Sequence, residues 1–287
     1  MVRYDRNKLL QLYEQAKAEK FAIPSFNYYG LWDMMAIVEA AEEMHAPVLL
    51  MSDPQVYETI GPEMCVHMVD VLASQASVPV IHHIDHSVNC IACKHAIDLG
   101  FKSIMMDASD KPIEQNVAFV KEIADYAHER GCFVEAEIGP TLTGSTYEAS
   151  YVGDNYLFDL QEAVRLVEEG SPDSLAIGIG NVHGFYIGKT ELNFQRLAEA
   201  KEAIQIPLVL HGGTGISGED ILKAIKGGIC KINVDTAINC AYMNGIRRQL
   251  IGGGENQFTL DVIRYGMDKV KVVVRQWIYM CRADNRI

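Results

Sequence analysis

Short apolar runs rich in β-branched residues recur along the chain, roughly every 20 to 40 residues, and amphipathic stretches lie between them. This alternation predicts parallel strands connected by helices, the pattern of an α/β fold. The predicted strands cover residues 21–26, 48–51, 80–83, 103–106, 133–137, 175–178, 208–211 and 229–234. The predicted helices between them cover residues 31–44, 89–99, 113–129, 160–169, 194–203 and 218–226.

Eight strand-helix units in a chain of 287 residues favour a closed (β/α)8 TIM barrel. A doubly wound open sheet with extra strands is the alternative. The chain from Ala237 onward is longer than one closing helix, so extra C-terminal helices are expected, with a glycine-rich break at 251–255. We expect residues 1–287 to form a single domain.

Polar residues gather at the C-terminal end of every predicted strand. They occupy positions 24–27, 52–53, 83–86, 107–109, 135–137, 181–184, 211–213 and 233–236. Barrel enzymes keep their active sites at this face, and a chance distribution would place polar residues at both ends. The pattern therefore predicts an active site over the mouth of the barrel.

Three histidines, His86, His183 and His211, follow the predicted third, sixth and seventh strands, so a closed barrel would bring them together. Three imidazoles with an open fourth position describe a catalytic zinc site, although a single histidine more often has a structural role. Gly184 and Gly212 follow two of them directly and would allow a ligand to approach closely.

Other residues with metal-binding chemistry are assigned structural roles. Alternation in the third strand sends either His82 or His83 inward, where packing or support of a ligand is expected. The pair Cys90 and Cys93 shares one helix face, and no second pair follows at zinc-ribbon spacing. Surface or packing roles are expected for the histidines that fall in helical stretches or at their ends, His45, His67, His95 and His128.

Asp85 directly precedes His86, so its carboxylate is expected beside the metal. A carboxylate there can take a proton from a substrate hydroxyl, or it can simply orient an imidazole. Glu137 and Asp107 are candidate oxygen ligands or partners of ligands, and pairing with a lysine is the structural alternative for each.

A glycine-rich turn at 211–218 joins the seventh strand to a helix and would present backbone N–H groups to an anion. The eighth strand ends in polar residues at 231–236, and phosphate sites recur at these two barrel loops, so a phosphorylated substrate is predicted. The spacing of Gly213, Gly215 and Gly218, followed by Asp235, also fits a dinucleotide-binding motif. That alternative leaves too little chain for a second nucleotide-binding half and does not explain the histidines.

The amino-acid composition limits which binding partners and which cellular compartment are expected. Apolar residues at 49 % and charged residues at 22 % are values of a globular protein. A net charge of −13 argues against nucleic acid or an anionic membrane as a partner. The charged N-terminal residues do not resemble a secretory signal, and seven scattered cysteines favour reduced thiols, so a cytoplasmic location is expected.

The chain resembles the class II ketose-bisphosphate aldolases, which act on fructose and tagatose bisphosphates. The similarity runs in order from about Leu9 to Arg286. The segments that carry it are Ile-Pro-Ser-Phe-Asn at 23–27, His-Ile-Asp-His at 83–86, Val-Glu-Ala-Glu-Ile-Gly at 134–139, Gly-Asn-Val-His-Gly at 180–184, Leu-Val-Leu-His-Gly-Gly at 208–213 and Lys-Ile-Asn-Val-Asp-Thr at 231–236.

The resemblance implies a zinc ion on His86, His183 and His211, with Glu137 and Asp107 as alternative or second-site ligands. Asp85 would deprotonate the C4 hydroxyl during cleavage, and Asn233 would lie near the enediolate of dihydroxyacetone phosphate. The residues expected to hold the phosphate or another part of the substrate are Gly184, Gly212, Thr214, Asp235, Thr236, Asn27, Ser52 and Arg264. A sodium or potassium ion near the phosphate and a homodimer or homotetramer are common in the family.

Two segments depart from the family pattern. The family's glutamate in the loop after the fifth strand, which handles the C3 proton, is replaced by Ser145, with Tyr147 or Glu148 as candidate substitutes. The family's Asp-Pro-Arg is replaced by Phe-Thr-Leu at 258–260, although Arg264 matches a later arginine that comes from a neighbouring subunit and meets the far phosphate.

The predicted function is reversible cleavage of a phosphorylated ketose in carbohydrate metabolism, as in glycolysis, to dihydroxyacetone phosphate and an aldehyde. The first alternative is the same chemistry on a ketose 1-phosphate with a different far end, such as 6-deoxy-6-sulfofructose 1-phosphate. The second is a sugar-phosphate-binding barrel with altered catalysis. A nucleotide-dependent oxidoreductase is a third.

Overall fold

The computed structural model describes residues 4–139, 142–143, 157–184, 191–254 and 256–287. Eight strands form a closed barrel in the order β1-β10-β9-β7-β5-β4-β3-β2, and every neighbouring pair is parallel. Their bounds are β1 (Ile23–Asn27), β2 (Val48–Ser52), β3 (Val80–Ser87), β4 (Ser103–Met106), β5 (Phe133–Ile138), β7 (Ser174–Ile177), β9 (Leu208–Leu210) and β10 (Ile229–Val234). The predicted TIM barrel is confirmed, and the open-sheet alternative is wrong.

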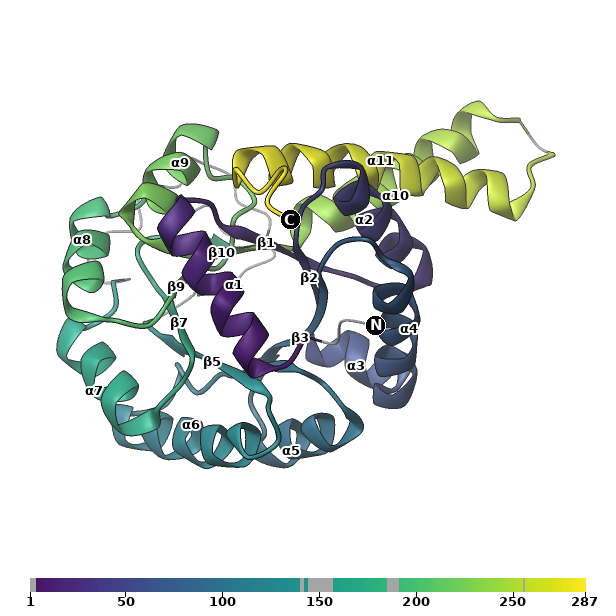
Figure 1. The fold of residues 1–287 in the computed structure, drawn as a ribbon. Coiled ribbons are helices and arrows are strands. Elements are labelled where there is room, and N and C mark those ends of the chain that lie inside the picture. The colour runs from purple at the N-terminus through teal and green to yellow at the C-terminus, as the bar shows by residue number, and fades with distance from the viewer. Residues whose placement is uncertain (1–3, 140–141, 144–156, 185–190, 255) are drawn as a thin grey trace.

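Helices surround this barrel (Figure 1). Those that match the sequence prediction are α2 (Leu31–Glu43), α5 (Cys90–Leu99), α6 (Ile113–His128), α7 (Leu160–Gly170), α8 (Phe194–Ala203) and α9 (Gly218–Gly227). Those that were not predicted are α1 (Arg6–Glu19), α3 (Pro54–Ile60) and α4 (Pro62–Gln75). Among the described residues, none of the helices combines the length and the hydrophobicity of a membrane-spanning segment. The cytoplasmic location stays a prediction.

Helix α1 lies across the N-terminal end of the barrel (Figure 1). It buries Leu9, Tyr13 and Ala16, which recur at helical spacing, and Tyr13 stacks on Phe133 of β5 with ring centroids 4.9 Å apart. The backbone N–H of Arg6 donates to the carbonyl of Gly131, just before β5. This helix therefore closes the end of the barrel opposite the predicted site.

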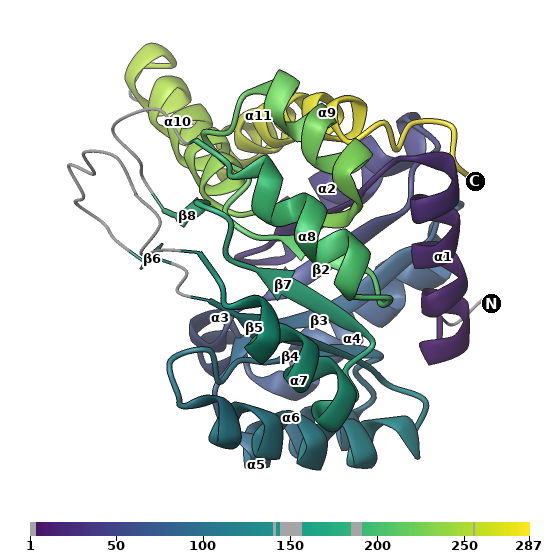
Figure 2. The same ribbon diagram turned by 90° about the vertical axis from the view of Figure 1, so that its left-hand side faces the viewer.

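The short strands β6 (Leu142–Thr143) and β8 (Val182–His183) pair in parallel at the other end, outside the barrel sheet (Figure 2). They come from the segments after β5 and β7. Because the carboxyl ends of all the barrel strands meet at this end, polar residues far apart in sequence can converge here.

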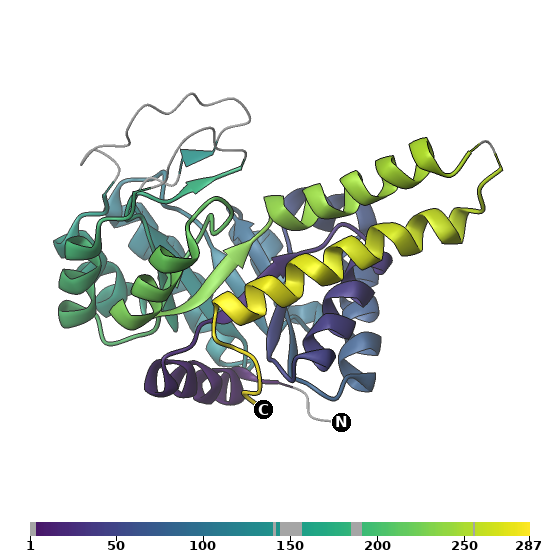
Figure 3. The ribbon, with the colours of Figure 1, turned by 90° about the horizontal axis from the view of Figure 1, so that it is seen from above.

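The C-terminal helices α10 (Thr236–Gly252) and α11 (Thr259–Met280) form the expected extension, with a break between them. They run antiparallel and project from the barrel as a hairpin (Figure 3). Gly245 and Gly266 allow the close crossing, because a Cβ atom on Gly245 would lie 2.9 Å from the Cα atom of Gly266.

Candidate active site

Asp85 and His86 both reach the mouth of the barrel, although neighbours in a regular strand point to opposite faces. The pairing of β3 with β4 shifts register between Ile84 and Ser87, and His86 has a φ of 46°, in the left-handed region. Such a bulge redirects a side chain. Strand β3 continues to Ser87 rather than ending at His83 as predicted, so His86 lies inside the strand.

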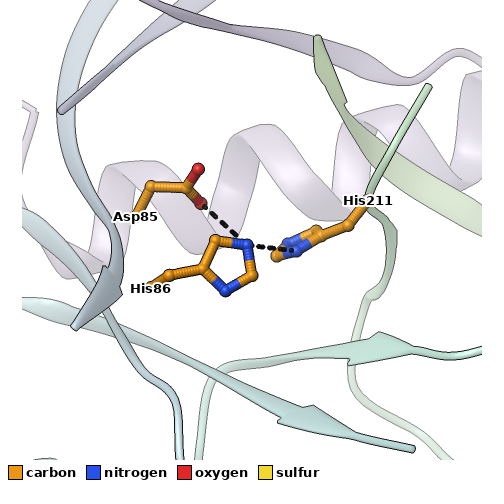
Figure 4. A group of neighbouring side chains, drawn as sticks. All are labelled: Asp85, His86 and His211. Carbon is orange, nitrogen blue, oxygen red and sulfur yellow. Dashed lines mark hydrogen bonds and ion pairs between the residues drawn. The ribbon is translucent and has the colours of Figure 1, made fainter. Parts of the chain in front are cut away.

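The imidazoles of His86 and His211 meet across the barrel (Figure 4). Nε2 of His86 lies 3.2 Å from Nδ1 of His211. The other nitrogen of each ring faces a carboxylate: Nδ1 of His86 is 2.8 Å from Asp107, and Nε2 of His211 is 2.9 Å from Glu135. A carboxylate accepts the ring N–H, so the two nitrogens that face each other can both present lone pairs to a metal ion.

This arrangement fits a metal centre. Two ligands of a tetrahedral zinc ion, each about 2.0–2.1 Å from the metal, lie about 3.3–3.4 Å apart, close to the observed separation of the two nitrogens. Ligand atoms of Asp85, His86 and His211 all lie within 4.8 Å of one another, as do those of His86, Asp107 and Glu137. Carboxylate and imidazole are ligands that zinc accepts.

The electrostatics of the site favour a cation. Burial alone would lower the pKa of His86, but the carboxylates of Asp85, Asp107 and Glu137 raise it to about 10. The pKa of His211 is also raised, because burial is outweighed by Glu135 and Glu137. Glu137 lies 3.4 Å from Nδ1 of His211 and 3.7 Å from Nδ1 of His86. The surrounding charge would therefore stabilise a bound metal ion.

Asp85 is held as a carboxylate beside these histidines. Its Oδ1 accepts a hydrogen bond of 3.0 Å from Nδ2 of Asn233, and its Oδ2 lies 3.5 Å from Nδ2 of Asn27. Burial opposes ionisation of Asp85, but His86, His211 and Lys231 hold its pKa below the ordinary value. The group is ionised at neutral pH and can accept a proton.

One pocket at the mouth of the barrel contains most of the predicted substrate residues. Its lining residues are Asn27, Asp85, His86, Gly184, Gly212, Thr214, Asn233, Asp235 and Thr236. Thr236 begins helix α10, and the backbone N–H of Ala237 donates to the Thr214 hydroxyl at 3.2 Å. A helix N-terminus beside two hydroxyls and glycine backbone can hold an anion.

Gly213 permits the close packing behind this pocket. A Cβ atom there would lie 2.9 Å from the carbonyl oxygen of Asn233 and 2.9 Å from Cγ2 of Ile232. The loop after β9 can therefore approach β10 closely only without a side chain at this position. This contact sets Thr214 beside the start of α10.

Other predicted site residues are placed differently. Ser52 is fully buried at the end of β2 and does not line the pocket. Arg264 lies on α11 of the projecting hairpin, with its side chain 72 % exposed. The side chain of His183 and the loop positions Ser145, Tyr147 and Glu148 lie outside the described residues.

The two neighbouring histidines of β3 separate as expected. His83 is fully buried, and its Nδ1 lies 2.7 Å from the hydroxyl of Ser103. His82 packs on Phe101, with ring centroids 4.0 Å apart, and its Nε2 lies 2.9 Å from the Tyr28 hydroxyl. Cys90 and Cys93 are free thiols outside the two candidate metal groups of the described residues.

Tyr29 was missed by the sequence reasoning. Its hydroxyl donates to Asp235 of the pocket, and its backbone N–H donates to Asp33 at 2.6 Å. Burial raises the pKa of Asp235 above its ordinary value. The position of Tyr29, two residues after the end of a strand, was a signal for a residue at the mouth.

Comparison with known proteins gives a consistent picture. The family model for class II fructose-bisphosphate aldolases matches residues 7–286. The crystal structure of the YdjI aldolase from Escherichia coli K12 is similar, with a TM-score of 0.86, 32 % identity, and coverage of 97 % of this chain and 98 % of that chain. A candidate fructose-1,6-bisphosphate aldolase from Coccidioides immitis has a TM-score of 0.87 and 28 % identity, with 98 % of each chain covered. Fructose-bisphosphate aldolase from Campylobacter jejuni shares the fold, with a TM-score of 0.82, 22 % identity, and coverage of 99 % and 97 %.

Proposed function

Since the chain belongs to the class II fructose-bisphosphate aldolase family and is an aldolase, we propose that it reversibly cleaves a phosphorylated ketose to dihydroxyacetone phosphate and an aldehyde. The observation that carries the proposal is the pair of imidazole nitrogens 3.2 Å apart, with the Asp85 carboxylate beside them. Aldol cleavage needs both features, because a cation must polarise a carbonyl while a base removes a hydroxyl proton.

The family is generally metal-dependent, and zinc is the ion we propose here. His86 and His211 would hold it, with His183 as the third ligand expected from the sequence. Glu137 and Asp107 lie beside His86, and their carboxylate oxygens would serve as alternative ligands or as ligands of a second metal ion. When bound, the ion would supply positive charge that polarises the substrate carbonyl.

Asp85 would act as the base. Its oxygen lies 3.9 Å from Nε2 of His86, so a substrate oxygen near the metal would also be near this carboxylate. Asn233 and Asn27 approach Asp85 through their amide groups and hold it in place. In the synthetic direction, the same carboxyl group would return the proton to the new hydroxyl.

The phosphate would bind in the pocket formed by the loops after β9 and β10. Thr214 and Thr236 offer hydroxyls, and the N-terminus of α10 offers backbone N–H groups. Gly184 and Gly212 line the same pocket without side chains. A sodium or potassium ion near this position, common in the family, would further offset the charge of a phosphate.

We propose a sugar bisphosphate of the fructose or tagatose type as the substrate. The alternative substrate is a ketose 1-phosphate with another far-end group, such as 6-deoxy-6-sulfofructose 1-phosphate, and the replacement at 258–260 is the observation that supports it. In a homodimer or homotetramer, the exposed Arg264 would meet the far end of a substrate bound to a second copy. Light scattering on purified protein tests that assembly.

A substrate panel tests the reaction. Ketose 1-phosphates and 1,6-bisphosphates are incubated with the zinc-loaded protein, and dihydroxyacetone phosphate is followed with a coupled dehydrogenase. We expect release from at least one substrate, loss of activity with a strong chelator and recovery with zinc. Cleavage that resists the chelator would contradict the proposal. Thermal stabilisation by these sugars without turnover would instead support the binding protein suggested by Ser145.

A further inference from the structure

Lys231 and Glu135 form an ion pair in the interior of the barrel, below the pocket. Both side chains are fully buried, and Nζ of Lys231 lies 2.9 Å from each oxygen of the Glu135 carboxylate. Strands β9 and β7 separate β10 from β5 in the sheet, so this contact crosses the interior. Lys231 was expected among the polar residues at the phosphate end of its strand. It does not line the pocket.

The same carboxylate also holds His211. Oε1 of Glu135 accepts the Nε2–H of His211 at 2.9 Å, and Ser174 donates its hydroxyl to Oε2 at 3.3 Å. A neutral imidazole carries one N–H, so a ring that donates through Nε2 keeps its lone pair on Nδ1. Nδ1 of His211 is the atom that faces His86.

The carboxylates that hold His86 and His211 are themselves fixed by different groups. Asp107, the partner of His86, receives hydrogen bonds from the backbone N–H and the hydroxyl of Ser109, at 3.0 and 2.7 Å. Glu135 is instead fixed by the ammonium of Lys231 on both of its oxygens. A lysine held in this way is charged and has no lone pair with which to attack a substrate, so its contribution is electrostatic and geometric.

We propose that Lys231 is a positioning residue of the metal centre: it anchors Glu135, and Glu135 fixes the ring orientation and the tautomer that make His211 a metal ligand. The inference rests on the proposed function, because it assumes that a metal ion binds at His86 and His211. Replacing a hydrogen-bond partner of a metal-bound histidine typically lowers metal affinity by about 10- to 100-fold.

Lys231→Met tests this role, because methionine fills much of the space of the lysine stem and removes the ammonium. Zinc affinity is measured by competition with a chromophoric chelator, and the coordination geometry by the visible absorption of the cobalt-loaded protein. We expect zinc binding to weaken by about 10- to 100-fold and the cobalt spectrum to change. A folded Lys231→Met protein with the affinity and spectrum of the unsubstituted protein would overturn the proposal.

Arg6→Met is the matched control. It removes a cation from another buried carboxylate, Asp173, which lies 2.6 Å from the guanidinium of Arg6 at the opposite end of the barrel. This variant should unfold more easily but retain zinc affinity and the cobalt spectrum. Weakening by the same factor in both variants would mean that general loss of stability, rather than positioning of His211, explains the effect, and would overturn the proposal.

A second variant covers the case in which Lys231→Met does not fold. Glu135→Gln combined with Lys231→Met removes both charges and leaves no uncompensated one in the interior. It should fold and still bind zinc more weakly than the unsubstituted protein, whereas unchanged affinity would again overturn the proposal.

The unsubstituted protein separates this inference from the proposed function. If it binds no zinc, the proposed metal centre is wrong, and if it binds zinc while the folded variants bind equally well, only the positioning role fails.

Discussion

Replacing Asp85 by asparagine should remove the base from the site while leaving its shape intact. Oδ1 and Oδ2 of Asp85 face the side-chain amides of Asn233 and Asn27. The amide oxygens of both asparagines are buried without a hydrogen-bond partner among the described residues. Rotation of either amide would offer its oxygen to the new NH₂ group, so Asp85→Asn should cost little stability.

The loss should appear in the rate of the chemical step. A positioned general base contributes about 10²- to 10⁴-fold, which corresponds to about 3 to 5 kcal/mol of activation free energy. We therefore expect kcat for ketose cleavage to fall by that factor in the coupled assay. Bound zinc is measured on the same samples, because Asp85 belongs to one of the two candidate metal groups and its replacement could also weaken metal binding.

Asp53→Asn is the control for loss of one negative charge near the mouth of the barrel. Asp53 caps α3 by accepting the N–H of Val56, and it does not line the pocket. This variant should retain kcat. The assignment of Asp85 as the base is refuted if the zinc-loaded Asp85→Asn protein cleaves substrate at nearly the rate of the unsubstituted protein.

Three further predictions concern the metal, the packing and the pH dependence. His211→Ala should lower zinc affinity by well over 10-fold, and retention of stoichiometric zinc in a chelator competition would exclude His211 as a ligand. Gly213→Ala should cost about 1–3 kcal/mol in urea unfolding, since the new Cβ meets the carbonyl oxygen of Asn233 at 2.9 Å. Burial opposes ionisation of Asp173, but His128, Arg6 and the N–H of Val134 lower its pKa. Its stabilising effect is therefore present above about pH 4 and is lost as the pH falls through the depressed folded-state pKa. Asp173→Asn should flatten the acid side of the stability profile measured by urea unfolding at several pH values, and an unchanged slope would count against this role.

Much of the barrel follows from local patterns. Strands β4 and β10 have the predicted bounds, because β4 is a short apolar run and β10 alternates apolar residues with Lys231 and Asn233. Helix α1 was not predicted although Leu9, Tyr13 and Ala16 recur at helical spacing, since the charged residues around them hide the pattern. The segment between β2 and β3 has prolines at 54 and 62, which begin α3 and α4 rather than break a helix.

The site was only partly predictable, because its chemistry depends on residue types and its geometry on closure of the barrel. Asp85 and His86 could be identified as neighbours with suitable groups. Regular alternation would have separated them, and no glycine marked the bulge that brings both to the mouth. A positive φ at a histidine is uncommon, so the sequence offered little sign of it.

Lys231 shows why the support of a site is harder to predict than its ligands. It lies on the same strand as Asn233 and faces the same interior, so the alternation of β10 does not distinguish their roles. What separates them is depth along the barrel: Lys231 is paired with Ile23 at the start of β1, whereas Asn233 is paired with Ser25 one layer closer to the mouth. The strand that each residue faces across the interior follows from the stagger of the closed sheet, which no single strand encodes. A lysine that the sequence placed near a phosphate is therefore found beneath the proposed metal centre, paired with Glu135.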